Sequence, residues 1–204
     1  MVGRTAELED VCVRIRSGRG VLLAGPAGVG KSRLAGEVLD ALAGEGVQTA
    51  RISATSASAG IPLGVFAPIL PTTTWTETSG AVNDRADLLS RCANTLVDRY
   101  LPARLVLLVD DIHLVDEMSA TLLYQLADTD RVTILATYRT REASPEHVVG
   151  LWKNELVDRV DLDGLDTGHI HEMIKRVLGG PVDDATLRIS PPRFRATCCS
   201  CVSS

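Results

Sequence analysis

The sequence predicts an α/β protein in which helices cover both faces of a mostly parallel, five-stranded sheet. Two observations predict this fold. Apolar segments alternate with helix-like segments along the chain, and this alternation is typical of parallel sheets. Four of the five apolar segments are also dense in Val, Ile and Leu, as expected for strands that are covered on both faces.

The expected elements follow one another in regular order. A helix over 6–15 precedes the first strand, and a helix over 167–179 follows the last. The expected strands are 21–25, 48–54, 104–111, 131–139 and 157–165. The helices expected between them are 31–43, 82–100, 117–128 and 145–156. The stretch 55–80 is rich in Ser, Thr, Ala, Gly and Pro, and we interpret it as a long connection or insertion.

Length and charge limit the classes of function. With 204 residues, the chain is long enough for one α/β domain and a fragment of a second. A net charge of −5 predicts no direct contact with nucleic acid, because such proteins carry a basic surface. There is no apolar run of membrane-spanning length and no signal peptide, so a cytoplasmic protein without membrane contact is expected. Cys12 and Cys92 are expected to be buried thiols.

The segment GPAGVGKS matches the phosphate-binding pattern G-x-x-x-x-G-K-[ST]. It follows an apolar strand and opens a helix, which is the context that this P-loop requires. Its backbone N–H groups and the helix N-terminus are suited to phosphates, with the lysine as a point charge and the serine hydroxyl as a Mg²⁺ ligand. The expected nucleotide-binding residues of this segment are Gly25, Pro26, Ala27, Gly28, Val29, Gly30, Lys31 and Ser32.

The segment LVLLVDDIHLVD (105–116) is the expected companion of the P-loop. An apolar strand that ends in acids places them at the carboxyl edge of the sheet, where α/β proteins bind ligands. We expect Asp110 to hold Mg²⁺ through water, and Asp111 to orient or deprotonate the attacking water. The alternative is that the two acids merely end a strand. For His113, both a structural and a functional role stay open.

The segment RVTILATYRT (131–140) ends another apolar strand, with Thr137 and Arg139 at its tip. Because this edge also faces the nucleotide, Arg139 is expected to sense or stabilise the γ-phosphate. A solvated arginine at a strand end is the alternative. His169 and His171 are two residues apart on an expected helix and do not share a face, so no metal site is expected there.

With these motifs, the chain resembles the ATPase domain of large LuxR-type transcriptional regulators, a group of signal-transducing, AAA-like P-loop ATPases. VGRTAELE (2–9) is similar to the family's opening box, so the resemblance implies that Val2, Gly3 and Arg4 lie against the adenine. Segment 61–71 also resembles a family segment, although no chemical role can be assigned to it. Segment 162–187 resembles the beginning of the family's helical lid.

The resemblance implies a three-layer P-loop NTPase with an incomplete helical lid. The expected domains are the ATPase core (1–165), the start of the lid (166–189) and an aberrant, disordered tail (190–204). It implies an ATP-binding switch that uses Mg²⁺, exchanges ATP and ADP and hydrolyses ATP slowly. A helix-turn-helix is not found in the sequence, and self-association through the core stays open. Two alternatives remain: a P-loop kinase for a small substrate, with 55–100 as its substrate lid, and a non-functional regulator fragment.

The tail RFRATCCSCVSS contains Cys198, Cys199 and Cys201. Three thiolates at this cramped spacing, without a fourth ligand nearby, make a metal site the weaker interpretation. We expect a frameshift near residue 190 instead. Cysteine codons begin with TG, and a shifted frame permits S-G-N-L-L-F-L-R-E-L, which resembles the next motif of the family's lid. Either a mutation or a sequencing error would produce this reading.

Overall fold

The computed structural model describes residues 4–71, 82–140 and 146–164. Several predictions made from the sequence lie outside these residues. They are the roles of Val2 and Gly3, the start of the lid (166–189), the aberrant tail with its cysteines, and the helix that carries His169 and His171.

The centre of the fold is a five-stranded sheet with the strand order β2-β3-β4-β1-β5. Every pair of neighbouring strands is parallel, so the predicted α/β class is confirmed. This arrangement is typical of a P-loop NTPase core. The strands are β1 (Gly20–Gly25), β2 (Gln48–Ser53), β3 (Leu105–Asp110), β4 (Val132–Arg139) and β5 (Val157–Asp161).

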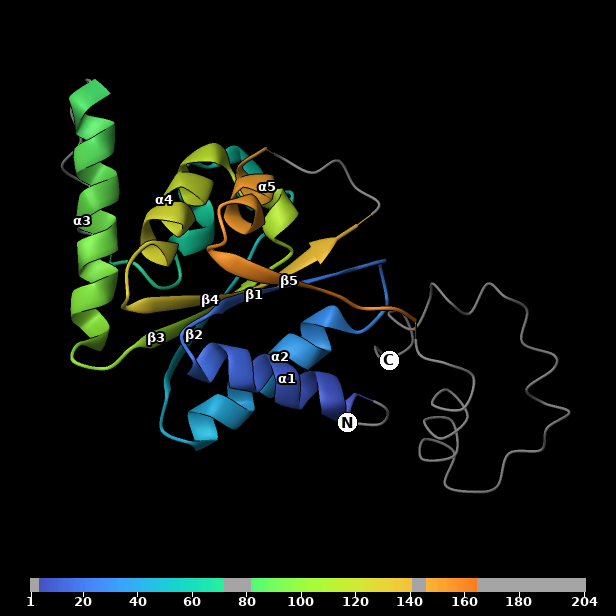
Figure 1. The fold of residues 1–204 in the computed structure, drawn as a ribbon. Helices are drawn as coiled ribbons and strands as arrows, with labels where there is room; N and C mark the ends of the chain where they lie inside the picture. The colour runs from blue at the N-terminus through green and yellow to red at the C-terminus, as the bar shows by residue number, and fades with distance from the viewer. Residues whose placement is uncertain (1–3, 72–81, 141–145, 165–204) are drawn as a thin grey trace, which may run out of the picture.

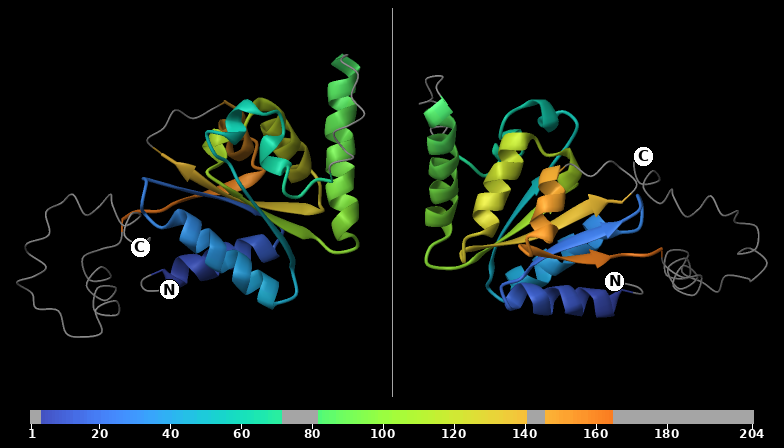
Figure 2. Two further views of the ribbon diagram at one scale, coloured as in Figure 1. Left: turned by 180° about the vertical axis from the view of Figure 1, so that it is seen from behind. Right: turned by 45° about the horizontal axis from the view of Figure 1, so that its top comes forward.

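Helices cover both faces of the sheet, as Figures 1 and 2 show from three directions. Helices α1 (Thr5–Arg16) and α2 (Lys31–Gly44) lie on one face. The opposite face is covered by α3 (Val82–Tyr100), α4 (Glu117–Ala127) and α5 (Glu146–Lys153). None of the helices in the described ranges is long and apolar enough to span a membrane.

The three central strands are buried on both faces. Along β1, Val21 and Leu23 pack against α1 and α2, whereas Leu22 and Ala24 belong to the core on the other face. This alternation follows from the two-residue period of a strand. It explains why the strand sequences are apolar throughout rather than alternating. Cys12 and Cys92 are buried free thiols, as predicted, and burial raises the pKa of each.

Several element ends differ from the prediction. The strand predicted over 104–111 ends at Asp110, because Asp111 adopts a left-handed backbone conformation with φ of +53° and opens a short 3-10 helix, η4 (Ile112–Leu114). The helix predicted over 145–156 ends at Lys153, where a turn with Glu155 at φ +58° leads into β5. The strand predicted over 157–165 ends at Asp161.

The first part of the stretch interpreted as a connection packs closely on the sheet. It contains two short 3-10 helices, η1 (Ser58–Gly60) and η2 (Gly64–Phe66). Its apolar side chains join the core on the side of α3, α4 and α5; they are Leu63, Val65, Phe66 and Leu70. Asp116 accepts a hydrogen bond from the backbone N–H of Leu63 at 3.2 Å. Segment 61–71, which had no chemical role, therefore has a packing role.

Candidate phosphate and metal site

The P-loop connects the end of β1 to the start of α2 at the carboxyl end of the sheet. Gly28 and Gly30 have φ of +76° and +94°, a conformation that is strained for residues with a side chain. Gly25 is restricted by packing instead, because an added Cβ would lie 2.6 Å from the carbonyl oxygen of Leu162. These glycines let the loop turn tightly and present backbone N–H groups at the start of a helix, where anions bind favourably.

Lys31 is the first residue of α2 and is only 5% exposed. Its Nζ donates to the carbonyl oxygens of Gly25 and Pro26, at 2.9 and 2.8 Å. The ammonium group is therefore hydrogen-bonded to the backbone of the P-loop itself. Binding a phosphate would replace these carbonyl oxygens with phosphate oxygens, which are stronger partners for an ammonium group.

Asp110 is the centre of a hydrogen-bond network at the end of β3. Its Oδ1 accepts from the hydroxyls of Ser32 and Thr137 at 2.8 and 2.7 Å. Its Oδ2 accepts from Nη2 of Arg51 at 3.0 Å. Burial alone would raise the pKa of Asp110, but the hydrogen bonds from Thr137, Ser32 and Arg51 outweigh it, and the pKa lies below the ordinary value. The carboxyl group is therefore held in its charged form.

The pair of Ser32 and Asp110 fits a magnesium ion. Hydroxyl and carboxylate oxygens are hard donors of the kind that Mg²⁺ prefers, and this ion usually keeps several waters and is completed by phosphates. Within the described residues, no group of three or more His, Cys, Asp or Glu side chains is placed to hold a metal. A metal here would therefore depend on phosphate and water for its remaining ligands.

Asp111 and Arg139 form a bidentate ion pair beside Asp110. The Nε and Nη2 atoms of Arg139 lie 3.1 and 3.0 Å from the two carboxylate oxygens of Asp111. Thr137, which is fully buried, accepts a hydrogen bond from the backbone N–H of Asp111 at 2.8 Å. The structure thus brings the four side chains at the tips of β3 and β4 into one network, although their catalytic roles stay predictions.

Arg4 fastens the P-loop to two other parts of the chain. Its guanidinium group donates to the carbonyl oxygens of Val29 and Asp163 and to the carboxylate of Glu7. The side chain is only 3% exposed. Arg4 therefore lies beside the loop, and its Nη1 and Nη2 atoms are bound to protein groups. The predicted contact between Arg4 and adenine stays a prediction.

His113 lies in η4, directly after the acid pair. The side chain is buried, and its ring packs edge-on against Tyr138, with 6.0 Å between the ring centroids and 83° between the planes. Of the two roles left open for His113, this position favours the structural one.

Sequence reasoning missed the part of Arg51 in this network and gave Thr137 no role. Arg51 reaches Asp110 only because β2 lies next to β3 in the sheet. A strand order cannot be read from the chain locally, so no signal pointed to Arg51. Thr137 had a signal, since it stands at the tip of an apolar strand two residues before Arg139.

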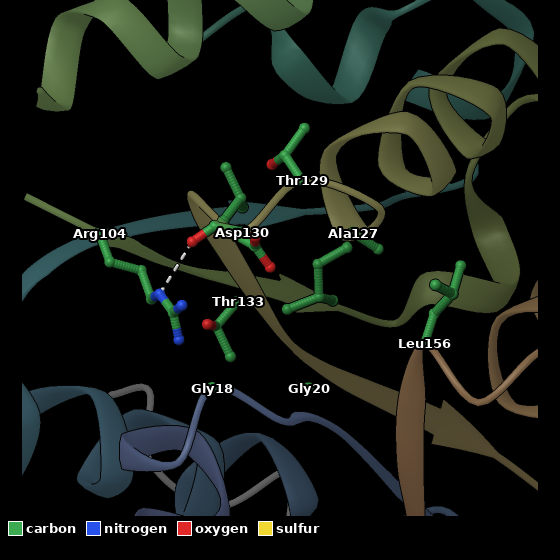
Figure 3. Close-up of a pocket in the computed structure, with 10 residues that line it drawn as sticks. Gly18, Gly20, Arg104, Ala127, Thr129, Asp130, Thr133 and Leu156 are labelled. Atoms are coloured by element: carbon green, nitrogen blue, oxygen red, sulfur yellow. Dashed lines mark hydrogen bonds between the residues drawn. The ribbon is translucent and has the colours of Figure 1, made fainter.

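The described surface also has a small hollow at the opposite edge of the sheet, where the strands begin (Figure 3). It measures about 70 Å³ and is bordered by Gly18, Gly20 and Arg104, whose Nε donates to the carbonyl oxygen of Asp130 at 3.0 Å. This volume is far below that of a typical ligand pocket. We therefore assign no ligand to this hollow.

Comparison with known proteins shows the family to which the chain belongs. A family model described as "AAA ATPase domain" matches residues 1–138, which include the P-loop, both acids and Thr137. No curated protein sequence matches the chain significantly.

Solved structures with a similar fold have little sequence in common with this chain. One is titled as a DNA replication initiation factor, with 14% identity, a TM-score of 0.60, and coverage of 92% of this chain and 55% of the other. AMPPCP-bound DnaA from Aquifex aeolicus has 13% identity, a TM-score of 0.57 and coverage of 95% and 59%. Cdc6p from Pyrobaculum aerophilum has 11% identity, a TM-score of 0.61 and coverage of 89% and 51%. The chain thus spans little more than half the length of these proteins, and the likeness shows the fold alone.

Proposed function

Because the chain belongs to the family of AAA ATPase domains and is a P-loop NTPase, we propose that it binds ATP with Mg²⁺ at the carboxyl edge of its sheet and hydrolyses the nucleotide slowly. The observation that carries this proposal is the contact between Ser32 and Asp110, whose oxygens lie 2.8 Å apart. It brings the end of the P-loop and the acidic tip of β3 together as a magnesium-binding pair requires.

In this proposal, residues Gly25 to Ser32 hold the phosphates through the backbone and through Lys31. Val2, Gly3 and Arg4 would lie near the adenine. Ser32 would ligate Mg²⁺, and Asp110 would hold the ion through water. When bound, Mg²⁺ neutralises charge on the phosphates and helps to align them for attack by water.

The ion pair between Asp111 and Arg139 supports slow hydrolysis. While Arg139 contacts both oxygens of the carboxylate, it competes with an attacking water molecule for Asp111. Arg139 must turn from Asp111 to a phosphate oxygen before Asp111 can orient and deprotonate a water molecule. Both residues would then act together, Asp111 on the water and Arg139 on the developing charge of the phosphate.

The binding proposal is tested by thermal unfolding with and without Mg-ATP. A ligand present at about 100 times its dissociation constant stabilises the folded state by about 2.7 kcal/mol, so the melting temperature of the wild type should rise clearly. Lys31→Ala should abolish the rise. Lys153→Ala is the matched control, because this lysine is exposed at the end of α5 and should leave the rise intact. An equal response of wild type and Lys31→Ala would contradict the proposal.

The same protein distinguishes the ATPase from a P-loop kinase. A hydrolysing switch releases phosphate from ATP with water as the only acceptor, whereas a kinase needs its small substrate. Phosphate release at a slow but measurable rate, lost in Asp111→Asn, is the expected result. No structural observation specifically favours the kinase.

We further propose that the domain belongs to a LuxR-type transcriptional regulator and works as its nucleotide switch. The support is the order and spacing of the segments that resemble this family, from VGRTAELE to the sequence around 162–187. The proposed division into core, lid and aberrant tail is tested on DNA. Codons 190–204, read in the shifted frame, should encode the missing lid motif, and a DNA sequence that cannot do so would overturn the frameshift.

A further inference from the structure

The nucleotide site contains a cation that the proposed function does not use. Arg51 lies on β2, at the edge of the sheet, and its Nη2 is 3.0 Å from Oδ2 of Asp110. The arginine side chain is 48% exposed, whereas the aspartate is 13% exposed. A guanidinium group therefore reaches from the surface to the carboxylate that is proposed to hold Mg²⁺.

The fold brings this arginine to the site in two ways. In the parallel pairing of β2 and β3, Arg51 lies opposite Leu108, two positions before the level of Asp110. On α2, Gly36 stands one turn after Ser32, and a Cβ at Gly36 would lie 3.8 Å from Nη1 of Arg51. The guanidinium group thus passes over Gly36. Because this glycine has no side chain, α2 does not block the path from Arg51 to Asp110.

We propose that Arg51 is a resident counter-ion of Asp110 that opposes Mg²⁺ binding and thereby sets the Mg²⁺ concentration at which the nucleotide site loads. The inference rests on the proposed function, because it concerns the same metal and nucleotide. Magnesium must either bind close to a fixed positive charge or move that charge away from Asp110. In both cases the arginine makes metal binding less favourable.

Removing the charge of Arg51 has two consequences of opposite sign. Without metal, Asp110 faces the phosphates as an uncompensated negative charge, so ATP should bind more weakly. When Mg²⁺ is bound, the ion neutralises the charge of Asp110, and it is no longer repelled by the arginine. The coupling between Mg²⁺ and ATP, measured as the ratio of ATP dissociation constants in EDTA and in saturating Mg²⁺, should therefore increase. A unit charge and a double charge about 6 Å apart in water give roughly a tenfold effect, and salt screening reduces it to about three- to tenfold.

The experiment measures this ratio with a fluorescent ATP analogue in wild type, Arg51→Gln, Arg51→Lys and Arg33→Gln. Arg33→Gln is the matched control, because Arg33 adjoins Ser32 in sequence and loses the same charge but contacts Glu37. Circular dichroism verifies that each variant is folded. We expect a three- to tenfold larger ratio for Arg51→Gln, with unchanged affinity in saturating Mg²⁺. Arg51→Lys should stay near the wild type, since it retains the charge, and Arg33→Gln should stay within about twofold.

Three results would overturn the inference, and each has a different meaning. An unchanged ratio in Arg51→Gln shows that the arginine does not oppose the metal. Weaker ATP binding in saturating Mg²⁺ shows that Arg51 is instead a ligand of the phosphates. An equal increase in Arg33→Gln shows a general effect of surface charge. If the wild type itself binds no nucleotide under either condition, the proposed function fails, and that result is distinct from the other three.

Discussion

Thr137 shows how one buried hydroxyl can arrange two acids. Its Oγ1 donates to Oδ1 of Asp110 and accepts from the backbone N–H of Asp111. A hydroxyl can do both at once, because it carries one hydrogen and two lone pairs. The left-handed backbone of Asp111 then turns its carboxylate toward Arg139 rather than along the strand. The geometry of the acid pair therefore depends on a residue of the neighbouring strand.

The lowered pKa of Asp110 predicts a dependence of stability on acid. An acid whose pKa is lower in the folded state stabilises that state fully above its unfolded pKa, and this contribution disappears as the pH falls through the folded pKa. The ordinary value is 3.8, and the folded value lies below it. The difference in free energy of unfolding between wild type and Asp110→Asn should therefore be constant above about pH 5 and shrink as the pH falls below 3.8.

Urea unfolding at a series of pH values measures this difference. Asp128→Asn is a suitable control, because this acid ends α4 on the other side of the molecule from Ser32. If the difference in free energy of unfolding stays constant down to the pH at which the protein unfolds, the hydrogen-bond network does not preferentially stabilise the charged form of Asp110.

At the scale of elements, Asp116 links α4 to the segment that contains η2. It is the N-cap of α4, where its carboxylate accepts from the backbone N–H and the hydroxyl of Ser119. The same carboxylate accepts from the backbone N–H of Leu63, which has φ of +58°. The cap of one helix therefore also holds a strained turn against the core.

Asp116→Ala should destabilise the protein more than the loss of an ordinary cap. Removing an N-cap costs about 0.5–2 kcal/mol, and leaving a partly buried N–H at Leu63 without a partner adds about 1–3 kcal/mol. Chemical denaturation should show that the free energy of unfolding falls by an amount at or above the upper end of the range for the loss of a cap alone. Asp116→Asn should recover much of it, because asparagine is an equally good cap. A loss below about 1 kcal/mol would mean that the turn at Leu63 is held by packing alone.

Much of the element pattern could be predicted from the sequence, because apolar strands and the P-loop leave clear local signals. All five strands and the described α-helices were expected within a few residues, whereas the short 3-10 helices were not. Strand order leaves no such signal, so Arg51 could not be connected with Asp110. Segment 61–71 was given no role for a related reason: the core that its apolar residues complete is built from distant parts of the chain.

At the scale of the whole molecule, Arg4 joins three segments that are far apart in sequence. It lies directly before α1, contacts the P-loop at Val29, and contacts Asp163 beyond the end of β5. The segment at Asp163 leads toward the residues expected to form the lid. A movement of the P-loop on nucleotide binding would therefore be transmitted through Arg4 to the segment that follows β5.

Arg4→Gln tests this connection. The shorter, neutral side chain leaves the carbonyl oxygens of Val29 and Asp163 without their charged donor, which should cost about 2–4 kcal/mol of stability. The rise in melting temperature on adding Mg-ATP should also shrink, since the loop is no longer held in its binding conformation. Arg14→Gln on α1 is the matched control: its ion pair with Asp10 lies at the surface, and Asp158 keeps Arg19 as a second partner, so it should cost less than about 1 kcal/mol. It should also retain the full response to Mg-ATP. A destabilised Arg4→Gln protein with an undiminished response would restrict Arg4 to a structural role, because its connection to the loop would then contribute nothing to nucleotide binding.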